Sequence, residues 1–187
     1  MGKMMEPADN ELVMACRSGS LGKFRILVER YKKPAYFYAL GMIGNADDAL
    51  DISQEAFINA YKSLNRFDGS YQFKSWLFSI LANLCKNALR SADVRRKYFS
   101  ASDAIDTAAV STAGDPEKCL IAKEQKEAVW KALSEIEEEA REIIILKHFQ
   151  DMSYKEISEV LGIPAGSVMS RLHYARLKLK KALGENF

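Results

Sequence analysis

The chain has 187 residues, of which 48% are hydrophobic and 28% are charged, and 27 Lys and Arg stand against 25 Asp and Glu for a net charge of +2. This balance is typical of one or two folded domains and excludes a disordered chain. A net charge this small does not by itself indicate a nucleic-acid-binding protein. Evidence for such a function would have to come from local clusters of charge. The sequence has neither an apolar run of about 18 residues nor an apolar core behind Lys3, so we expect no membrane insertion and no secretory signal.

No pattern of side chains predicts a catalytic or metal site. The cysteines, Cys16, Cys85 and Cys119, are odd in number and widely spaced, which is typical of reduced thiols in the cytoplasm rather than of a disulfide framework. His148 and His173 have no cysteines at zinc-finger spacing, and the glycine motifs of nucleotide-binding loops and serine hydrolases do not occur. We therefore expect no enzyme activity, catalytic residue, metal, cofactor or small-molecule substrate. A Cys–His nucleophile is the alternative that stays open.

Residues 9–90 carry apolar side chains at helical spacing, which predicts a block of helices. A first short helix is predicted by the apolar residues Leu12, Val13 and Cys16. Pro34 is expected to begin a new helix, because its fixed φ suits a first helical turn. Asn45, after Gly44, is expected to cap the next helix. The apolar stripe of that helix consists of Leu50, Phe57, Ile58, Tyr61 and Leu64.

The composition changes after this first helical block. Residues 100–115 contain no basic or aromatic residue and are mostly small or acidic, so they have too little apolar area to fold by themselves. A loop of this length inside one compact domain is unusual. We therefore expect an all-α fold of two helical domains, at 1–92 and 117–187, joined by a flexible linker at 93–116.

The most specific local pattern lies near the C-terminus. Ser153 and Glu156 have the spacing of a capping box, so Ser153 should begin a helix. Gly162 has the position of a left-handed residue that ends this helix, and Pro164 or Ala165 then opens a second one. The apolar stripe of the second helix consists of Val168, Leu172, Ala175, Leu179 and Leu183. A short glycine-containing joint between two helices predicts a helix-turn-helix in the second domain.

The second of these helices has a strongly basic surface. No acidic residue occurs between Pro164 and Leu183. Its basic residues are Arg171, Arg176, Lys178, Lys180 and Lys181. Such a run suits duplex phosphates, while the start of the helix would face base edges in the major groove. The residues expected nearest the DNA are Ala165, Ser167, Ser170 and Arg171. The alternative is an ordinary helical hairpin with a solvated basic face.

An acidic cluster lies in the first block. Asp47, Asp51 and Glu55 recur at helical spacing, so they share one helix face, with Asp48 beside them. Like charges on one face repel each other and slightly destabilise the helix. The cluster is either a solvated face with acids at the helix start or a docking surface for a basic protein partner.

An aromatic cluster follows in the segment RFDGSYQFKSW, with Phe67, Tyr71, Phe73 and Trp76. Amide and basic residues share a face of the next helix, namely Asn83, Lys86, Asn87 and Arg90. Rings that stack on unpaired bases, beside cations that hold phosphates, are typical of sites for single-stranded nucleic acid. The alternative is that Phe73 and Trp76 belong to the core and only the charges are exposed, which we expect for part of the set, foremost for Trp76.

Three segments in this order resemble a known family: GNADDALDISQEAFINAY, FKSWLFSILANLCKNALR and, beyond the linker, MSYKEISEVLGIPAGSVMSRLHYARLKLKKAL. They are similar to bacterial RNA polymerase sigma factors of the extracytoplasmic-function (ECF) type, over both helical blocks. The resemblance implies a subunit that binds core RNA polymerase, recognises the −10 and −35 promoter elements and aids strand opening, without catalysis of its own.

The resemblance also implies which residues meet which partner. Those implied for the β′ clamp coiled coil of the polymerase are Asp47, Asp48, Asp51, Gln54 and Glu55. Those implied for the −10 element are Phe67, Tyr71, Phe73, Lys74, Asn83, Lys86, Asn87 and Arg90. Those implied for the −35 duplex are Ala165, Ser167, Ser170, Arg171, His173, Tyr174 and Arg176.

Two further partners are implied, the polymerase β flap and an anti-sigma factor that holds such proteins inactive. Similar proteins usually have a basic residue at Met169 and Val at Ala165, so the base contacts at −35 are not assigned. The alternative function is a helix-turn-helix regulator that acts without docking to polymerase; the acidic helix and the aromatic loop argue against it. A third hypothesis is a small helical enzyme or adaptor, and the lack of a set of catalytic residues argues against that.

Overall fold

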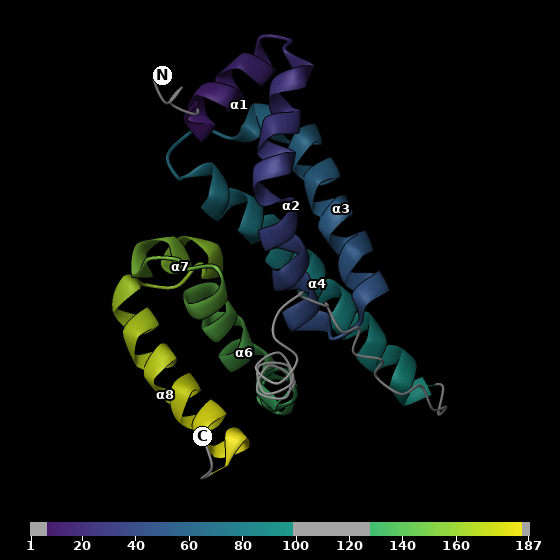
Figure 1. Ribbon diagram of the computed structural model, residues 1–187, viewed down its shortest axis with the longest axis vertical. Helices are drawn as coiled ribbons and strands as arrows, with labels where there is room; N and C mark the ends of the chain where they lie inside the picture. The colour runs from purple at the N-terminus through teal and green to yellow at the C-terminus, as the bar shows by residue number, and fades with distance from the viewer. Residues whose placement is uncertain (1–6, 99–127, 185–187) are drawn as a thin grey trace, which may run out of the picture.

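The computed structural model describes residues 7–98 and 128–184, except for the side chains of Leu21 and residues 93–98. These parts of the chain are helical and contain no β-strand, which confirms the all-α fold (Figure 1). The elements are α1 (Asp9–Arg17), α2 (Leu21–Ile43), α3 (Ala46–Lys62), η1 (Leu64–Arg66), α4 (Phe73–Tyr98), α6 (Glu138–Ile144), η2 (Ile145–Phe149), α7 (Tyr154–Leu161) and α8 (Ala165–Leu183). A further helical segment covers 128–135. None of the described helices is long and apolar enough to cross a membrane.

The predicted start of the linker does not coincide with the end of a helix. α4 continues to Tyr98, so residues 93–98, at the start of the predicted linker, are helical. The remainder of the predicted linker, 99–116, lies outside the described residues, as does Cys119.

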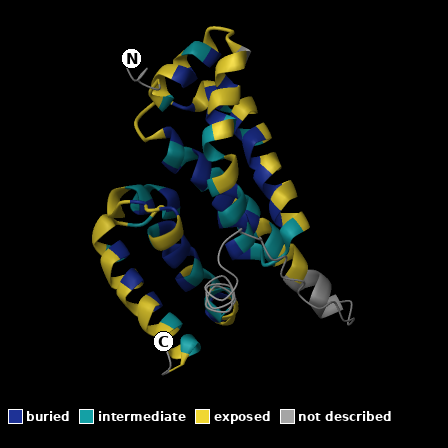
Figure 2. Cartoon of the chain, viewed as in Figure 1, coloured by how far each residue is buried: buried dark blue, intermediate teal, exposed yellow. Residues whose placement is uncertain are grey.

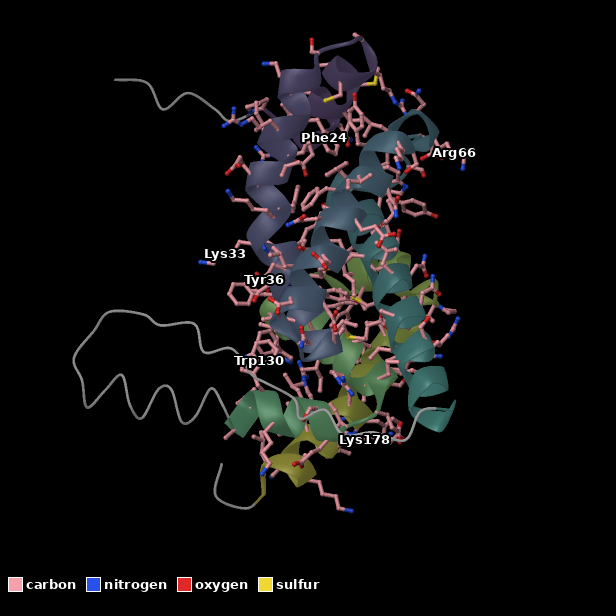
Figure 3. All side chains as sticks on the ribbon, turned by 90° about the vertical axis from the view of Figure 1, so that its right-hand side faces the viewer. Phe24, Lys33, Tyr36, Arg66, Trp130 and Lys178 are labelled. Carbon is pink, nitrogen blue, oxygen red and sulfur yellow. The ribbon has the colours of Figure 1, made fainter. Side chains whose placement is uncertain are left out.

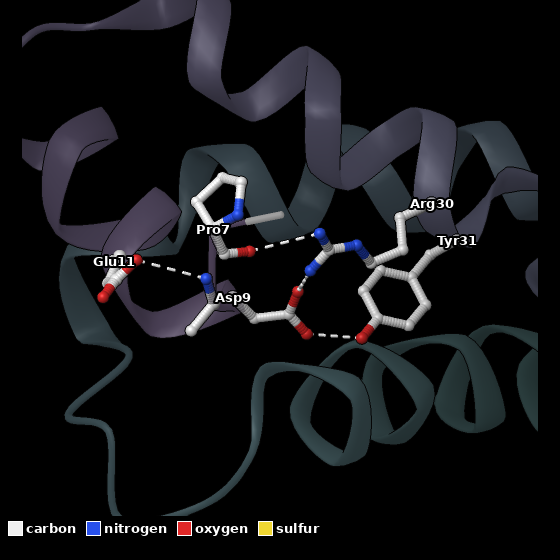
Figure 4. Close-up of polar contacts among 6 residues, drawn as sticks. Pro7, Asp9, Glu11, Arg30 and Tyr31 are labelled. Carbon is white, nitrogen blue, oxygen red and sulfur yellow. Dashed lines mark hydrogen bonds and ion pairs between the residues drawn. The ribbon is translucent and has the colours of Figure 1, made fainter. Parts of the chain in front are cut away.

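The first helix is fixed to the second by a polar contact. The residues of α1 that face the core are Leu12, Val13 and Cys16, as their spacing predicts. At the start of α1, the carboxylate of Asp9 accepts hydrogen bonds from Arg30 and Tyr31 of α2 (Figure 4). Burial and the neighbouring carboxylate raise the pKa of Tyr31 well above its usual value, so its hydroxyl keeps its proton and donates.

The long helix α2 runs through Pro34 without a break, so the expectation that Pro34 begins a helix is wrong. A proline inside a helix removes one backbone donor. The helix continues because one apolar face stays in phase across the proline. The buried residues of this face are Phe24, Leu27, Ala35, Tyr38, Ala39 and Met42. Their packing against α3 and α4 outweighs the missing hydrogen bond.

The break between α2 and α3 is capped as the sequence predicts. Gly44 follows α2 with φ at 81°, in the left-handed region that glycine adopts without strain. Asn45 then caps α3, because its side-chain oxygen accepts from the backbone N–H groups of Asp47 at 2.9 Å and Asp48 at 3.0 Å. Asp47 and Asp48, in the first turn of α3, therefore lie at the positive end of the helix dipole.

The predicted helix-turn-helix is present as α7 and α8. Glu156 N donates to Ser153 Oγ at 3.2 Å and Ser153 N donates to the Glu156 carboxylate at 2.8 Å, which completes the capping box. Burial acts to raise the pKa of Glu156, but its bonds with Ser153 outweigh this effect and lower it. Gly162 ends α7 with φ at 63°, and α8 begins at Ala165. The buried residues of α8 are Val168, Leu172 and Ala175.

The N-terminal helices (α1–α4) and the C-terminal helices (128–135, α6, η2, α7 and α8) pack against each other. α7 lies on α4, and α6 and η2 lie on α2, so the buried side chains of both groups form one continuous core (Figure 2). The approach is close at Gly41 of α2, where a Cβ atom would come within 2.7 Å of Ile145 and 2.9 Å of Trp130. Figure 3 shows Trp130 beside the end of α2. Glycine at position 41 therefore permits the packing of the two groups.

Candidate functional site

The outward face of α3 carries acidic and apolar side chains together. Its exposed residues form one stripe at helical spacing, here called the acidic stripe: Asp47, Leu50, Asp51, Gln54, Glu55 and Ile58. Asp48 is exposed beside it. Leu50 is 47% exposed and Ile58 is 52% exposed, although the sequence placed both in the apolar stripe of this helix. Exposed apolar groups among charges are typical of a protein-binding surface.

The opposite face of α3 explains why the acidic stripe points outward. Small or apolar residues there pack on α2 and α4, and they are Ala49, Ile52, Ser53, Ala56, Phe57 and Ala60. Several of these side chains are alanine, so the helix lies close to its neighbours, and the longer side chains Leu50 and Ile58 are left on the outer face.

The aromatic loop is built differently from the sequence prediction. Phe67 is only 4% exposed and Phe73 is fully buried, so neither ring can stack on a base in this structure. The ring of Phe67 lies 6.1 Å from Phe73 and 5.1 Å from Trp76, and Tyr31 packs on Phe73 at 5.8 Å. The structure thus places Phe73 in the core, which is the alternative that the sequence left open, and it buries Phe67 as well, because both rings belong to an aromatic cluster that holds the loop on the core. Trp76, expected in the core, is partly buried at its margin.

The loop and α4 still present an exposed polar face. Tyr71 is 53% exposed, and Asn83, Asn87 and Arg90 are exposed along α4. The loop is ordered by Asp68, whose carboxylate accepts from the N–H of Ser70 at 2.9 Å and from its hydroxyl at 2.6 Å. Arg66 projects outward from the turn before the loop (Figure 3).

The two lysines of the predicted −10 set are not free. Lys74 Nζ donates to the backbone oxygen of Gln150 at 2.7 Å. Lys86 Nζ lies 2.9 Å from a carboxylate oxygen of Glu142, which is only 2% exposed. Tyr38 donates to the other oxygen of Glu142, also at 2.9 Å. Burial raises the pKa of Glu142, although Lys86 and Tyr38 act in the opposite direction.

The outer face of α8 carries the predicted −35 residues. Ala165, Ser170, Arg171, His173, Tyr174 and Arg176 are exposed and Ser167 is partly exposed. Figure 2 shows this face as the outer edge of α8. Arg171 has no hydrogen-bond or ion-pair partner in the described part of the chain. Arg176 donates to His148 at 3.2 Å and Lys178 pairs with Glu137, so these two cations are held against the C-terminal helices.

A shallow groove lies between α6 and α8. Its volume is about 210 Å³, and its lining residues are Ile144, His148, Arg176, Leu179, Lys180 and Leu183. The groove therefore has an apolar floor and a basic rim. Burial lowers the pKa of His148, with smaller effects from Arg176 and Lys147, so its Nε2 is unprotonated at neutral pH and accepts from Arg176.

The two thiols in the described part of the chain do not form a nucleophilic site. Cys16 and Cys85 are buried, free thiols. Burial raises the pKa of Cys85 to about 12 and also raises that of Cys16, so neither is a thiolate at neutral pH. No group of three metal-ligating side chains occurs within residues 7–98 and 128–184.

Four residues have a place in the structure that the sequence analysis did not give them. Leu50 and Ile58, expected in the apolar stripe of this helix, instead extend the acidic stripe, and their spacing relative to Asp47 and Asp51 is the signal that could have shown this. Glu142 and Tyr38 join the two groups of helices, but they are 104 residues apart, so no local pattern predicts their contact.

Comparison with known proteins identifies the family. Residues 27–95 match the family model of Sigma-70 region 2, and residues 126–179 match that of Sigma-70 region 4. The chain is 32% identical to the ECF RNA polymerase sigma-E factor of Escherichia coli K12 over 174 residues, 90% of either chain. It is 29% identical to the ECF RNA polymerase sigma factor SigW of Bacillus subtilis strain 168 over 186 residues, 96% of this chain and 98% of that protein.

A solved structure has the same fold. The sigma factor RpoE of Bartonella quintana, crystallised with the anti-sigma factor NepR, matches with a TM-score of 0.73 at 21% identity, covering 89% of this chain and 100% of that one. The helix-turn-helix, the exposed acidic helix and these relatives lead to the same conclusion. The chain belongs to the extracytoplasmic-function family of RNA polymerase sigma factors.

Proposed function

We propose that this sigma factor binds core RNA polymerase and promoter DNA through separate surfaces. The acidic stripe of α3 docks on a basic surface of the polymerase β′ clamp coiled coil, where Asp47, Asp51 and Glu55 set the orientation. Leu50 and Ile58 supply the apolar contact in the same interface. The observation that carries this proposal is the outward exposure of acids and apolar residues on one helix face.

The DNA contacts are proposed for the two other surfaces. The exposed face of α4, with Asn83, Asn87 and Arg90, holds the separated strand of the −10 element, and Tyr71 is the exposed ring that stacks on a base. Phe67 and Phe73 support this face from below. The outer face of α8 reads the −35 duplex, with Arg171 as the cation best placed for a base or phosphate.

The arrangement of these surfaces supports the proposal. α3 and α8 lie at opposite edges of the molecule (Figure 1), so polymerase and the −35 duplex do not compete for space. The groove between α6 and α8, with its apolar floor and basic rim, is the proposed contact for the β flap. An anti-sigma factor is a further proposed partner, since the similar RpoE was crystallised with one.

In vitro transcription with bacterial core polymerase tests the proposal. Genomic fragments are transcribed with core enzyme alone and with core enzyme plus this chain, and the 5′ ends of the transcripts are mapped. We expect new start sites only when the chain is present, preceded by shared −35 and −10 sequences. Binding of the chain to duplex DNA with no new start site would contradict the proposal and favour a regulator that acts without polymerase.

A further inference from the structure

Arg17, the last residue of α1, is bound to the turn that precedes the aromatic loop. Its guanidinium donates twice to the carbonyl oxygen of Leu64, from Nε at 3.1 Å and from Nη2 at 2.9 Å. Leu64 is the first residue of η1, and its side chain is buried. Figure 1 shows α1 at the end of the molecule where α3 ends and this turn begins. Because the donors of arginine form a rigid fork, two bonds fix the orientation of the guanidinium as well as its distance.

The oxygen that Arg17 holds lies where the backbone leaves η1. The N–H of Phe67 donates to the same oxygen at 3.2 Å, and the backbone of Phe67 is already extended, with ψ at 110°. The ring of Phe67 packs on Trp76 at 5.1 Å. The aromatic cluster therefore holds the start of the loop on its buried side, and the exposed Arg17 holds it at the surface.

The charge of Arg17 also acts on the loop itself. Hydrogen bonds from the hydroxyl and the N–H of Ser70 lower the pKa of Asp68, and the positive charge of Arg17 adds a smaller lowering. Asp68 is therefore ionised at neutral pH and accepts both bonds from Ser70. Arg17 thus stabilises two points of this segment, the Leu64 carbonyl before the loop and the Asp68 carboxylate within it.

We propose that Arg17 is a positioning residue for promoter opening, because it holds residues 67–72 in the conformation that presents Tyr71 to the separated strand. The inference rests on the proposed role of this loop and of α4 in strand binding. Tyr71 is 53% exposed, so its place relative to α4 follows from the course of the loop backbone. A loop that is held before the strand arrives loses less conformational freedom on binding, which favours the open promoter. Arg17 acts through the Leu64 carbonyl and contacts neither a base nor a phosphate.

Three variants separate the hydrogen bonds of Arg17 from its charge. Arg17→Met removes the donors and keeps an unbranched side chain. Arg17→Lys keeps the cation but offers one nitrogen in place of the fork. Arg25→Met is the matched control, because it removes the same charge from an exposed position on α2. Arg17→Lys also carries the test if Arg17→Met loses helical circular dichroism, since a cation at the end of α1 still suits the helix dipole.

Promoter opening is measured with core polymerase and the full chain, on a promoter found by mapping start sites. Permanganate oxidises unpaired thymines, so it reports the separated −10 strand. We expect about fivefold less open promoter with Arg17→Met, a smaller loss with Arg17→Lys and none with Arg25→Met, at equal affinity for core polymerase. The loss should be the same at about 50 mM and about 200 mM salt. A loss that shrinks as the salt concentration rises would make Arg17 a phosphate contact and overturn the inference.

The fluorescence of Trp76 tests the position of the loop in the free chain, without polymerase. The chain has two tryptophans, so Trp130→Phe leaves only Trp76, which lies beside Phe67. In this background, acrylamide should quench the fluorescence faster in Arg17→Met than in Arg25→Met, because a displaced loop uncovers the indole. Unchanged quenching, or faster quenching with unchanged promoter opening, would overturn the inference. A wild-type chain without mapped start sites would overturn the proposed function, whereas the quenching result would still decide whether Arg17 holds the loop.

Discussion

Tyr38 of α2 donates its hydroxyl hydrogen to Glu142 of α6 over 2.9 Å, although 104 residues separate them in the chain. The other carboxylate oxygen of Glu142 is paired with Lys86 of α4. One buried carboxylate thus joins three helices from both ends of the chain. The stability of the packed arrangement should therefore depend on the charge of this single side chain.

We first predict a pH dependence that Glu142→Gln removes. Burial raises the pKa of Glu142 in the folded protein above its usual value of 4.5. The folded protein therefore binds this proton more tightly than the unfolded chain, so the contribution of Glu142 to stability is greatest below pH 4.5 and falls as the pH rises through the raised pKa. Glutamine is neutral at every pH, so the free energy of unfolding of Glu142→Gln should increase relative to that of the wild type as the pH rises. Urea denaturation from about pH 4 to pH 8 measures the difference.

The groups that face Glu142 must be included in this comparison. They are Lys86 and Tyr38, which favour the ionised form, and Glu138, which opposes it. Glu139→Gln, at an exposed position of the same helix, is the matched control. A constant difference between Glu142→Gln and the wild type over this range would contradict the prediction.

Asp51→Lys should weaken binding to core polymerase by roughly 1–3 kcal/mol, because it reverses a charge in the middle of the acidic stripe. Affinity for duplex DNA should stay unchanged. Glu135→Lys makes the same charge change on the exposed surface of the C-terminal helices and serves as the control. Fluorescence anisotropy of labelled chain, titrated once with core enzyme and once with duplex DNA, measures the two affinities. An equal loss of polymerase affinity in Asp51→Lys and Glu135→Lys would argue against docking by α3.

Leu50→Ser and Ile58→Ser should each lower polymerase affinity while leaving the free energy of unfolding within about 0.5 kcal/mol of the wild type, because both side chains are about half exposed. Met14→Ser, at an exposed apolar residue of α1, should change neither quantity. Thermal denaturation and polymerase titration measure the two effects. A large loss of stability in Leu50→Ser would show that the side chain belongs to the core.

Arg171→Ala should weaken binding to the −35 duplex by roughly 1–3 kcal/mol if the guanidinium contacts a base. The loss should then depend on the sequence of the duplex. A loss of similar size on every duplex, with a smaller salt dependence, would instead assign Arg171 to a phosphate. Lys131→Ala, at an exposed residue outside the helix-turn-helix, is the control.

Two glycines of the helix-turn-helix should respond to alanine with opposite signs. Gly162 has φ at 63°, where an L side chain is strained, so Gly162→Ala should lower stability by about 1 kcal/mol. Gly166 lies within α8 and has open space around its Cβ position, so Gly166→Ala should raise stability by up to about 1 kcal/mol. Thermal denaturation of both variants decides this, and a loss in both would contradict the assigned conformations.

The local features of the fold could be predicted from the sequence because each depends on a few neighbouring residues. The caps at Asn45 and Ser153 and the end of α7 at Gly162 follow from side-chain chemistry and from φ alone. The exposure of the acids on α3 likewise follows from helical spacing.

The sequence predictions are wrong at positions where tertiary packing determines the conformation or the burial of a residue. Pro34 is tolerated inside α2 because an apolar face continues across it. Phe67 and Phe73 are buried because they pack on each other, and Phe73 also packs on Tyr31. Composition cannot distinguish an aromatic cluster that stacks on bases from one that supports a loop. The contacts of Glu142 depend on how two groups of helices meet, which no local pattern encodes.

Lys74 reaches a main-chain oxygen rather than a side chain of the C-terminal helices. Every amino acid at position 150 supplies that oxygen, so a saturation mutagenesis of the C-terminal half would leave this bond in place and overlook it. Only a change at Lys74 itself removes this bond, so a mutational comparison of the two contacts has to pair a Lys74 variant with a Glu142 variant.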